Sequence, residues 1–385
     1  MAGSSFGNIF RISTWGESHG KAIGVVVDGC PAGIELNEEI IQAYLDRRKP
    51  GQNRFSTQRA EGDKVEILSG VFEGETTGTP ISMIVHNKDQ HSKDYSEIAS
   101  YYRPGHADFT FDAKYGFRDY RGGGRSSGRE TIGRVAAGAI AMTALKSMGI
   151  EVTAYTAQIG NVKCDREKIE KVNILKSPIY MPDLEASERA MEALDFSRAE
   201  MDSMGGIVDC VITGVPAGVG EPVFDKLDAT LAKAVMSIGA VKGVQIGSGF
   251  EVASKRGSEN NDEFTGESQS ENSAFKISKF FDEDGELISN IKSTNHAGGI
   301  LGGISDSDPI LVSAAFKPTP SIAKTQSTIN KKGEQIDINI KGRHDPVIVP
   351  RAVVVVESMA AITVFDLLLS SMTSRMDKIK EFFGR

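Results

Sequence analysis

Cysteine and tryptophan are scarce in this sequence, with three cysteines and one tryptophan in 385 residues. Cys30, Cys164 and Cys210 stand far apart and no CxxC pair occurs, so neither a zinc ribbon nor a dithiol site is expected. A sparse and odd set of thiols is typical of a reducing compartment. The cysteine content therefore favours a cytoplasmic protein.

Long apolar runs and a surplus of basic residues are also lacking. No run approaches about 18 apolar residues without a charge, and no basic segment precedes an apolar one near the N-terminus. We therefore expect neither a membrane span nor a signal peptide. The formal net charge of -8 argues against a general nucleic-acid binder, because such proteins need a basic surface. Local clusters of arginine are still compatible with this charge.

Glycine, in contrast, is abundant, with 41 residues. Such a content is typical of many tight turns or of loops that lie close to a ligand. The composition is otherwise that of an ordinary globular protein, with 39% hydrophobic and 25% charged residues. The length suffices for a large core and, by itself, would suggest two or three domains.

A short pattern occurs twice in the chain. Residues 27–33 read Val-Asp-Gly-Cys-Pro-Ala-Gly, and residues 212–218 read Ile-Thr-Gly-Val-Pro-Ala-Gly. Each copy follows an apolar strand pattern and precedes a helical one, at 37–48 and at 223–238. The repetition favours two related strand–turn–helix halves that share one core. Chance similarity of a short turn is the alternative.

Two further helices and a polar segment are predicted. Residues 128–148 are dense in small side chains, which let another element approach closely, and Gly149 is a natural end for this helix. Residues 351–383 are mostly helical and nearly apolar all round from 359 to 369, as in a helix buried in a core or a subunit interface. Residues 254–272 are polar and poor in aromatics, which is typical of a mobile surface loop.

Three loops place histidine or arginine beside glycine or proline. The turn at 16–21 differs from a phosphate-binding loop because only three residues separate its glycines. Its His19 is either a poised proton donor or a solvated surface residue. Arg48 and Arg54 lie at a helix end. Their guanidinium groups either bind an anion in bidentate fashion or belong to a solvated, basic helix terminus. His106, which follows Pro-Gly, is either an oriented acid–base group or a structural histidine.

The strongest signal is the glycine-rich segment 119–130, which runs into the small-residue helix. A glycine-rich loop at a helix N-terminus offers backbone N–H groups to an anion. Ser126 and Ser127 add hydroxyl donors, and Arg125 and Arg129 add positive charge. The segment is not the dinucleotide fingerprint, since Ser127 stands where the third glycine is required. A flexible linker fits this pattern poorly.

A last group of loops lies in the C-terminal third. Glycines in 295–303 permit close approach of the backbone to a flat ligand. Lys317 and Arg343 supply contacts to anions, and Asp345 can tune the proton affinity of a neighbour. Each of these loops alone is compatible with a purely structural role.

In kind and in order, these loops resemble the motifs of the chorismate synthase family. The matching segments are 16–20, 47–52, 103–108, 125–131, 295–305, 317–321 and 343–346. The main departure is the polar stretch at 254–292. The resemblance implies an α+β fold, a β-α-β sandwich with internal pseudo-duplication. It further implies a single domain over residues 1–385 with a mobile polar insertion around 254–292, and a homotetramer.

The resemblance also implies an activity. The substrate would be 5-enolpyruvylshikimate 3-phosphate, and anti 1,4-elimination of phosphate and the C6 hydrogen would give chorismate, the last common step of the shikimate pathway and of aromatic amino acid biosynthesis. This carbon–oxygen lyase reaction would require reduced FMN without net redox change. NADPH is a candidate reductant of the flavin. Neither nucleic acid nor a membrane is an expected partner.

Residue roles follow from the same resemblance. His19 would protonate or stabilise the departing phosphate, His106 would protonate the flavin or hold it protonated, and Asp345 would help flavin N5 to act as a base. Candidates for the substrate's phosphate and carboxylates are Arg48, Arg103, Arg129 and Arg343. Candidates for contacts to the cofactor are Arg125, Ser126, Ser127, Gly239, Ala240, Gly302, Lys317, Pro318, Thr319, Pro320, Ser321 and Arg343. Arg48 and Arg54 would contact nicotinamide in an enzyme that reduces its own flavin.

Two other classes compete with this interpretation. One is a metal-dependent phosphohydrolase that uses His19, His106 and Asp345, although the sequence has no HExxH motif and no two-cysteine metal spacing. The other is a non-catalytic anion-binding module.

Overall fold

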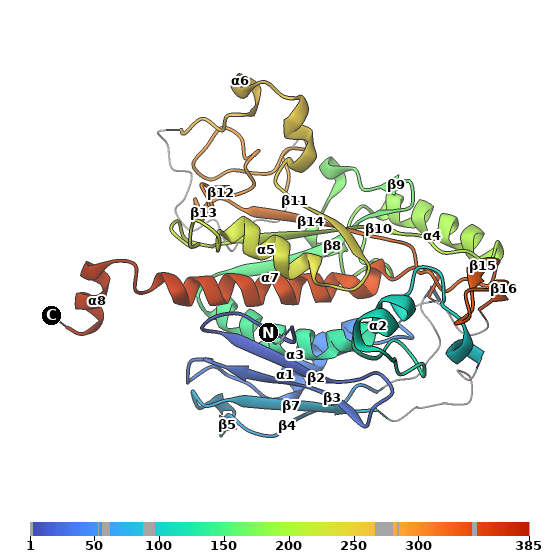
Figure 1. Cartoon of the computed structure of the whole chain (residues 1–385). Coiled ribbons are helices and arrows are strands. Elements are labelled where there is room, and N and C mark those ends of the chain that lie inside the picture. The colour runs from blue at the N-terminus through green and yellow to red at the C-terminus, as the bar shows by residue number, and fades with distance from the viewer. Residues whose placement is uncertain are drawn as a thin grey trace.

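Two antiparallel sheets enclose a layer of helices in the computed structural model, which describes residues 3–52, 54–55, 62–87, 97–265, 280–282, 285–340 and 345–384. The first sheet has the order β1-β2-β3-β7-β4, and the second has the order β11-β14-β10-β8-β9. Figure 1 shows helices α1, α3, α5 and α7 between them. The expected α+β sandwich is therefore confirmed.

The elements of each layer come from separate parts of the chain. The strands of the first sheet are β1 (Ser5–Phe6), β2 (Arg11–Gly16), β3 (Ala22–Asp28), β4 (Val65–Ile67) and β7 (Ile81–His86). Those of the second are β8 (Glu151–Ile159), β9 (Val162–Lys163), β10 (Gly206–Thr213), β11 (Val241–Ile246) and β14 (Ile310–Phe316). The helices between them are α1 (Glu38–Arg48), α3 (Thr131–Ser147), α5 (Leu227–Met236) and α7 (Val349–Ser371).

Smaller elements lie around this sandwich. The peripheral helices are α2 (Asp108–Tyr115), α4 (Leu184–Ala199), α6 (Gly257–Asn260) and α8 (Met376–Phe382). Three hairpins are β5–β6 (Val71–Phe72 and Glu75–Thr76), β12–β13 (Ile300–Leu301 and Ile304–Ser305) and β15–β16 (Thr325–Ile329 and Gln335–Asn339).

The strand order supports the internal duplication. The first half runs β2-β3-α1-β4-β7-α3 along the chain, and the second runs β8-β10-α5-β11-β14-α7. In space the strands follow the orders β2-β3-β7-β4 and β8-β10-β14-β11, so each strand of one half has a counterpart in the other. The repeated turns also correspond, because Gly29 and Gly214 have φ angles of 71° and 81°. A Cβ atom at these positions would lie 1.9 and 2.2 Å from a backbone oxygen, of Ile9 and Gly149 respectively, so both turns require glycine.

The core helices α3 and α7 pack face to face because α3 is built from small residues. At Gly138 a Cβ atom would lie 2.3 Å from Cβ of Ser358, so the two backbones approach as closely as glycine allows. Helix α7 is long and apolar enough to cross a membrane by composition, but 89% of its most apolar window is buried inside the protein. Helix α7 therefore lies in the core, which is one of the two locations expected for a helix that is apolar on all sides.

Several predicted boundaries are wrong. Helix α5 begins at Leu227 and not at 223, because an isolated β-bridge from Glu221 to Asp225 closes a turn there and leaves Phe224 91% exposed. The helix expected from 128 begins with a 3-10 turn before α3 proper. The segment 351–383 is mostly helical, as predicted, with an interruption between α7 and α8.

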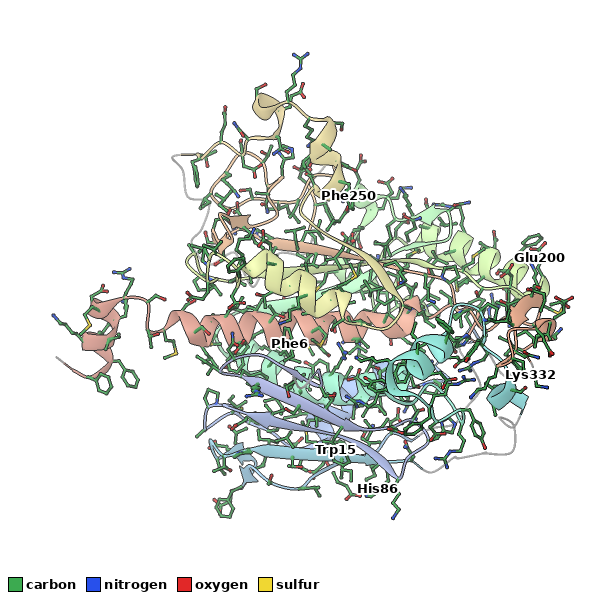
Figure 2. All side chains as sticks on the ribbon, viewed as in Figure 1. Phe6, Trp15, His86, Glu200, Phe250 and Lys332 are labelled. Atoms are coloured by element: carbon green, nitrogen blue, oxygen red, sulfur yellow. The ribbon has the colours of Figure 1, made fainter. Side chains whose placement is uncertain are left out.

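The outer faces of the two sheets differ. On the second sheet, Tyr155 is covered by Phe280, whose ring is stacked 5.9 Å away, and Phe281 and Leu287 complete a small second core. On the first sheet, Trp15 lies on Gly24 and stays 39% exposed (Figure 2). Phe280, Phe281 and Leu287 thus cover the sheet of their own half.

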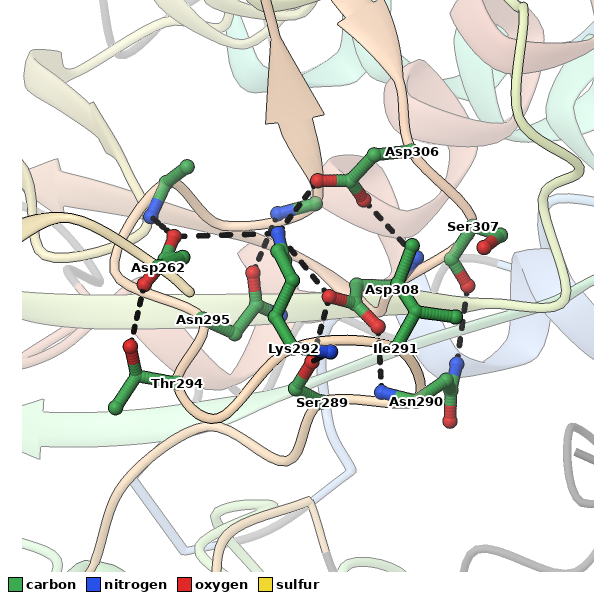
Figure 3. Close-up of polar contacts among 12 residues, drawn as sticks. Asp262, Ser289, Asn290, Ile291, Lys292, Thr294, Asn295, Asp306, Ser307 and Asp308 are labelled. Atoms are coloured by element: carbon green, nitrogen blue, oxygen red, sulfur yellow. Dashed lines mark hydrogen bonds and ion pairs between the residues drawn. The ribbon is translucent and has the colours of Figure 1, made fainter. Parts of the chain in front are cut away.

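The polar stretch at 254–292 is anchored at both described ends. It contains α6, and its residues 266–279 and 283–284 lie outside the described part of the chain. The ammonium group of Lys292, whose side chain is 0% exposed, lies 2.5 Å from a carboxylate oxygen of Asp306, 3.1 Å from one of Asp308 and 3.9 Å from one of Asp262 (Figure 3). We call these four residues the Lys292 cluster. The predicted mobility of the stretch stays a prediction.

The carboxylates of the Lys292 cluster are also held by other donors. Asp308 accepts hydrogen bonds from the Ser289 hydroxyl at 2.7 Å and the Asn290 backbone N–H at 2.5 Å. Asp262 accepts bonds from the Thr294 hydroxyl and from the backbone N–H groups of residues 296 and 297. Burial alone would lower the pKa of Lys292, but Asp306 and Asp308 outweigh it and raise this pKa. The cluster therefore joins the ends of the insertion to the turn before β14.

Candidate functional site

The His19 turn follows β2 and meets the glycine-rich segment. Nδ1 of His19 lies 3.0 Å from the hydroxyl oxygen of Ser18. A Cβ atom at Gly122 would lie 2.3 Å from this same nitrogen, so the imidazole packs directly on the backbone of the glycine-rich segment. Glycine at this position is what allows the two loops, which are about a hundred residues apart in sequence, to meet.

Arg125 joins the glycine-rich segment to β2. Its guanidinium donates to the carbonyl oxygens of Thr14 and Gly16, both at 3.1 Å, and to the Thr14 hydroxyl at 2.6 Å. The two neighbouring serines make local bonds. The Ser126 hydroxyl donates to the Gly123 carbonyl at 2.6 Å, and the Ser127 hydroxyl accepts from the backbone N–H of Arg129 at 3.3 Å. These contacts fix the shape of the loop that was predicted to hold an anion.

Arg48 and Arg129 meet at one buried carboxylate. Asp63 lies 3.0 Å from a terminal nitrogen of Arg48 and 3.1 Å from one of Arg129. We call these three residues the Arg48 cluster. Arg48 is only 2% exposed, and burial lowers its pKa to about 10, although Asp63 opposes this shift. Within the described part of the chain, Nε of Arg48 has no hydrogen-bond partner. Asp63 therefore contacts both guanidinium groups, and Nε of Arg48 is left without a partner among the described residues.

Asn87 connects the Arg48 cluster to the His19 turn. Its amide nitrogen donates to the carbonyl oxygens of Glu17 and Gly20, both at 2.9 Å. Its amide oxygen accepts from Arg129 at 2.8 Å. Sequence reasoning missed Asn87 and Asp63, because neither stands in a loop with a recognisable pattern.

Asp345 is connected to the Arg48 cluster through Arg351. Its carboxylate is 2.5 Å from a terminal nitrogen of Arg351, and Nε of Arg351 donates to the backbone carbonyl of Arg48 at 3.1 Å. The adjacent Pro346 carbonyl accepts from the backbone N–H of Met204 at 2.8 Å. Three predicted site residues, Arg48, Arg129 and Asp345, are thus brought together from distant parts of the chain.

His106 stands at the end of a tight turn. Pro104 and Gly105 occupy the central positions, Gly105 has a φ of 70°, and the His106 N–H donates to the Arg103 carbonyl at 3.3 Å. Arg103 forms a bidentate pair with Asp108, with both bonds at 2.8 Å. Burial, and after it the charge of Arg103, lowers the pKa of His106 to about 4. The imidazole is therefore neutral at neutral pH.

The segment 317–321 packs on this turn. Nζ of Lys317 donates to the Gly105 carbonyl at 2.7 Å, and the Ser321 hydroxyl oxygen lies 2.9 Å from Nε2 of His106. The Thr319 carbonyl accepts from the Ser203 hydroxyl at 2.7 Å. Because Ser203 precedes Met204, this contact links the His106 turn to the Asp345 side of the site.

The remaining candidates are distributed unevenly. Gly239 and Ala240 lie beside the 317–321 segment, since the Lys317 N–H donates to the Ala240 carbonyl at 2.9 Å. Gly302 lies elsewhere, in the β12–β13 turn near the N-terminus of α5, whereas Ala240 follows the C-terminus of that helix. Arg54 is 61% exposed and pairs with Asp195 of α4. Arg343 is outside the described residues.

Known proteins match this chain over almost its whole length. A family model described as chorismate synthase matches residues 10–369. A chorismate synthase of Lachnoclostridium phytofermentans is 65% identical over 385 residues, which are 100% of both chains. One of Methanococcoides burtonii is 52% identical over 374 residues, 96% of this chain and 97% of its own. A solved structure, "Crystal Structure of Chorismate Synthase", has a TM-score of 0.72 at 29% identity and covers 98% of this chain and 97% of its own. The chain therefore belongs to the chorismate synthase family and is, as a member of it, a carbon–oxygen lyase.

Proposed function

We propose that the protein converts 5-enolpyruvylshikimate 3-phosphate to chorismate by anti 1,4-elimination of phosphate and the C6 hydrogen, with a requirement for reduced FMN. The observation that carries this proposal is the set of contacts from the backbone of the His19 turn through Asn87, the Arg48 cluster and Arg351 to Asp345. It joins predicted catalytic and anion-binding residues from both halves of the chain.

The charges of these residues suit the substrate. It carries one phosphate and two carboxylates, which guanidinium groups bind in bidentate fashion. Arg48, Arg103 and Arg129 are the described candidates, and each now pairs with a carboxylate of the protein. Substrate anions would compete with Asp63 and Asp108 for these guanidinium groups.

The residues near His106 suit a flavin. The Thr319 hydroxyl oxygen is buried and has no hydrogen-bond partner within the described residues, and such groups are rare unless a ligand or water serves them. Gly239 is exposed and no atom lies within 4 Å of the position that its Cβ atom would take, so a ligand can approach its backbone. The residues that would hold FMN are Gly239, Ala240, Lys317, Pro318, Thr319, Pro320 and Ser321, with Gly302, Arg343, Arg125, Ser126 and Ser127 as further candidates. Reduced FMN, when bound, would supply electron density as phosphate leaves and take it back as the C6 hydrogen is removed.

The protein's own groups would manage protons and charge. His19 would give a proton to the departing phosphate, a role that suits imidazole near neutral pH. His106, neutral in the unliganded protein, would gain its proton only when an anionic ligand offsets the charge of Arg103. Asp345, held by Arg351, would assist removal of the C6 hydrogen.

Several further properties belong to the same proposal. The pathway would be that of aromatic amino acid biosynthesis, in the cytoplasm, and the assembly a homotetramer. NADPH is the candidate reductant, with Arg48 and Arg54 as its proposed contacts. A single domain over residues 1–385 is likewise proposed, because one hydrophobic cluster includes side chains of both sheets and of all four helices between them.

An anaerobic assay tests the reaction. The protein is mixed with 5-enolpyruvylshikimate 3-phosphate and dithionite-reduced FMN, and chorismate absorbance and released phosphate are followed. Equal amounts of both products, only with reduced flavin, are expected. Phosphate without chorismate would favour a phosphohydrolase, and neither product from a folded, FMN-binding protein would refute the proposal.

A further inference from the structure

We propose that Ser321 holds the imidazole of His106 in one tautomer and carries the proton between Nε2 of His106 and the bound ligand. The identity of that ligand rests on the proposed function, but the contact between the two side chains does not.

Hydrogen-bond chemistry assigns the tautomer. Nδ1 of His106 lies 3.0 Å from the Pro104 carbonyl oxygen, which can only accept, so Nδ1 carries the hydrogen. In a neutral imidazole Nε2 is then an acceptor, and its partner at 2.9 Å is the Ser321 hydroxyl. Ser321 therefore donates to Nε2 in the unliganded protein.

The backbone around this pair is fixed on both sides. A Cβ atom at Gly105 would lie 2.7 Å from Cβ of Pro320, so the two segments touch at the residue before each partner. Nζ of Lys317 holds the Gly105 carbonyl at 2.7 Å. The distance between His106 and Ser321 is thus set by two contacts besides their own.

Burial, and after it the charges around His106, lowers its pKa and keeps its resting form neutral. Arg103 and Lys317 disfavour the imidazolium, while Asp108 favours it but is neutralised by its bidentate pair with Arg103. An anionic ligand next to Ser321 would reverse this balance.

Proton transfer then proceeds without any further reactant. When Nε2 is protonated, its N–H donates to Oγ of Ser321, and the hydroxyl hydrogen turns toward the ligand. As the Nε2–H bond breaks, an O–H bond forms at Ser321, and the original hydroxyl proton passes to the ligand atom. The reverse sequence returns a proton to Nε2.

The first test uses the flavin-free protein with ¹⁵N-labelled histidine. At neutral pH, Nδ1 of His106 is expected to be protonated and Nε2 unprotonated, and His106→Gln assigns the signals. Ser321→Ala should shift the Nε2 resonance and lower the pKa of His106, since the bond that the imidazolium N–H donates to Oγ is charge-assisted and stronger than the bond that neutral Nε2 accepts. Ser321→Thr, which keeps the hydroxyl, should restore both values. Ser203→Ala, which loosens the same segment without touching His106, should leave them unchanged.

The second test is turnover with reduced FMN. Ser321→Ala should lower kcat by about 10²-fold, the lower end of the effect of a positioned acid, with KM nearly unchanged, and Ser321→Thr should recover most of the loss. A protonated Nε2 in the resting protein, or a Ser321→Ala kcat within threefold of the unaltered value, would overturn the relay. A protein without chorismate synthesis but with the expected spectra would refute the proposed function and leave the tautomer assignment standing.

Discussion

The two halves of the protein share one topology but contain buried ion clusters of opposite balance. In the first half, two guanidinium groups of the Arg48 cluster contact the same carboxylate, and Nε of Arg48 has no hydrogen-bond partner within the described residues. In the second half, the Lys292 cluster has one ammonium for three carboxylates. Its carboxylates also accept bonds from hydroxyl and backbone N–H groups.

This difference indicates that the two clusters have different roles. A buried carboxylate that accepts several hydrogen bonds is stable without a further partner, so the Lys292 cluster suits a structural role. A buried cation with a donor left over, such as Arg48, is stabilised by an additional anion. The Arg48 cluster therefore suits a binding site, and the predictions below test this distinction.

The largest expected effect is on stability, from Lys292→Met. The substitution leaves the carboxylates of Asp306 and Asp308 buried without their cation, which we expect to cost about 3–5 kcal/mol of unfolding free energy. Urea denaturation measures it. The matched control is Lys226→Met, because Lys226 is 42% exposed and its pair with Asp228 at 3.5 Å is worth at most about 1 kcal/mol. Equal losses in the two variants would contradict a structural Lys292 cluster.

A smaller loss, with a distinctive rescue, is expected for Asp63→Asn. Loss of the carboxylate between Arg48 and Arg129 should lower stability by about 3 kcal/mol, the lower end of the cost of breaking a buried ion pair. Inorganic phosphate should restore more stability to this variant than it adds to the unaltered protein, since an anion that binds only the folded state stabilises it. Thermal unfolding over a phosphate series measures this. Phosphate should not rescue Lys292→Met, and an equal rescue of both variants would remove the distinction.

The smallest effect is expected for Asp262→Asn and depends on pH. Burial alone would raise the pKa of Asp262, but bonds from Ala297, Thr294 and His296 outweigh it and hold this pKa below its usual value. Such a carboxylate contributes stability that is present above its unfolded pKa and lost as pH falls through the folded pKa.

At pH 7 the variant should be less stable by about 1 kcal/mol. The difference should stay constant down to about pH 5 and shrink below about pH 4. Urea denaturation at a series of pH values checks this, with the unaltered protein as reference. A difference that grows on acidification would have the wrong sign.

Local sequence patterns predicted the elements that are determined by residues close together in the sequence. Helix α1 begins after Asn37, whose side chain accepts from the Ile40 N–H at 2.9 Å, as its capping pattern predicted. The paired glycine turns and the small residues of α3 also follow from short-range sterics. The start of α5 was missed because its turn depends on a backbone pairing, of residues 221 and 225, that hydrophobic periodicity does not reveal.

For the candidate site, the sequence predicted the loops but not how they combine. His19, Arg48, Arg129, Asp345 and His106 were singled out from their neighbours along the chain. Their contacts to Asn87, Asp63, Arg351 and Ser321 were not, because these partners stand at sequence separations of 6 to 215 residues without a shared motif. The position of Gly302, away from the 317–321 segment, is likewise a result of the tertiary fold, because β14 lies between the two in the chain.

The sequence by itself determined which segments carry charged side chains and which carry glycine. It set where glycine permits a close approach, where a helix begins, and which loops carry arginine or histidine, since these depend on single residues and their immediate neighbours. Only the tertiary structure decided which carboxylate meets which cation, and whether a donor stays unpaired. Those outcomes depend on how two sheets from distant parts of the chain pack on one helical layer, and burial then gives the resulting pairs their strength.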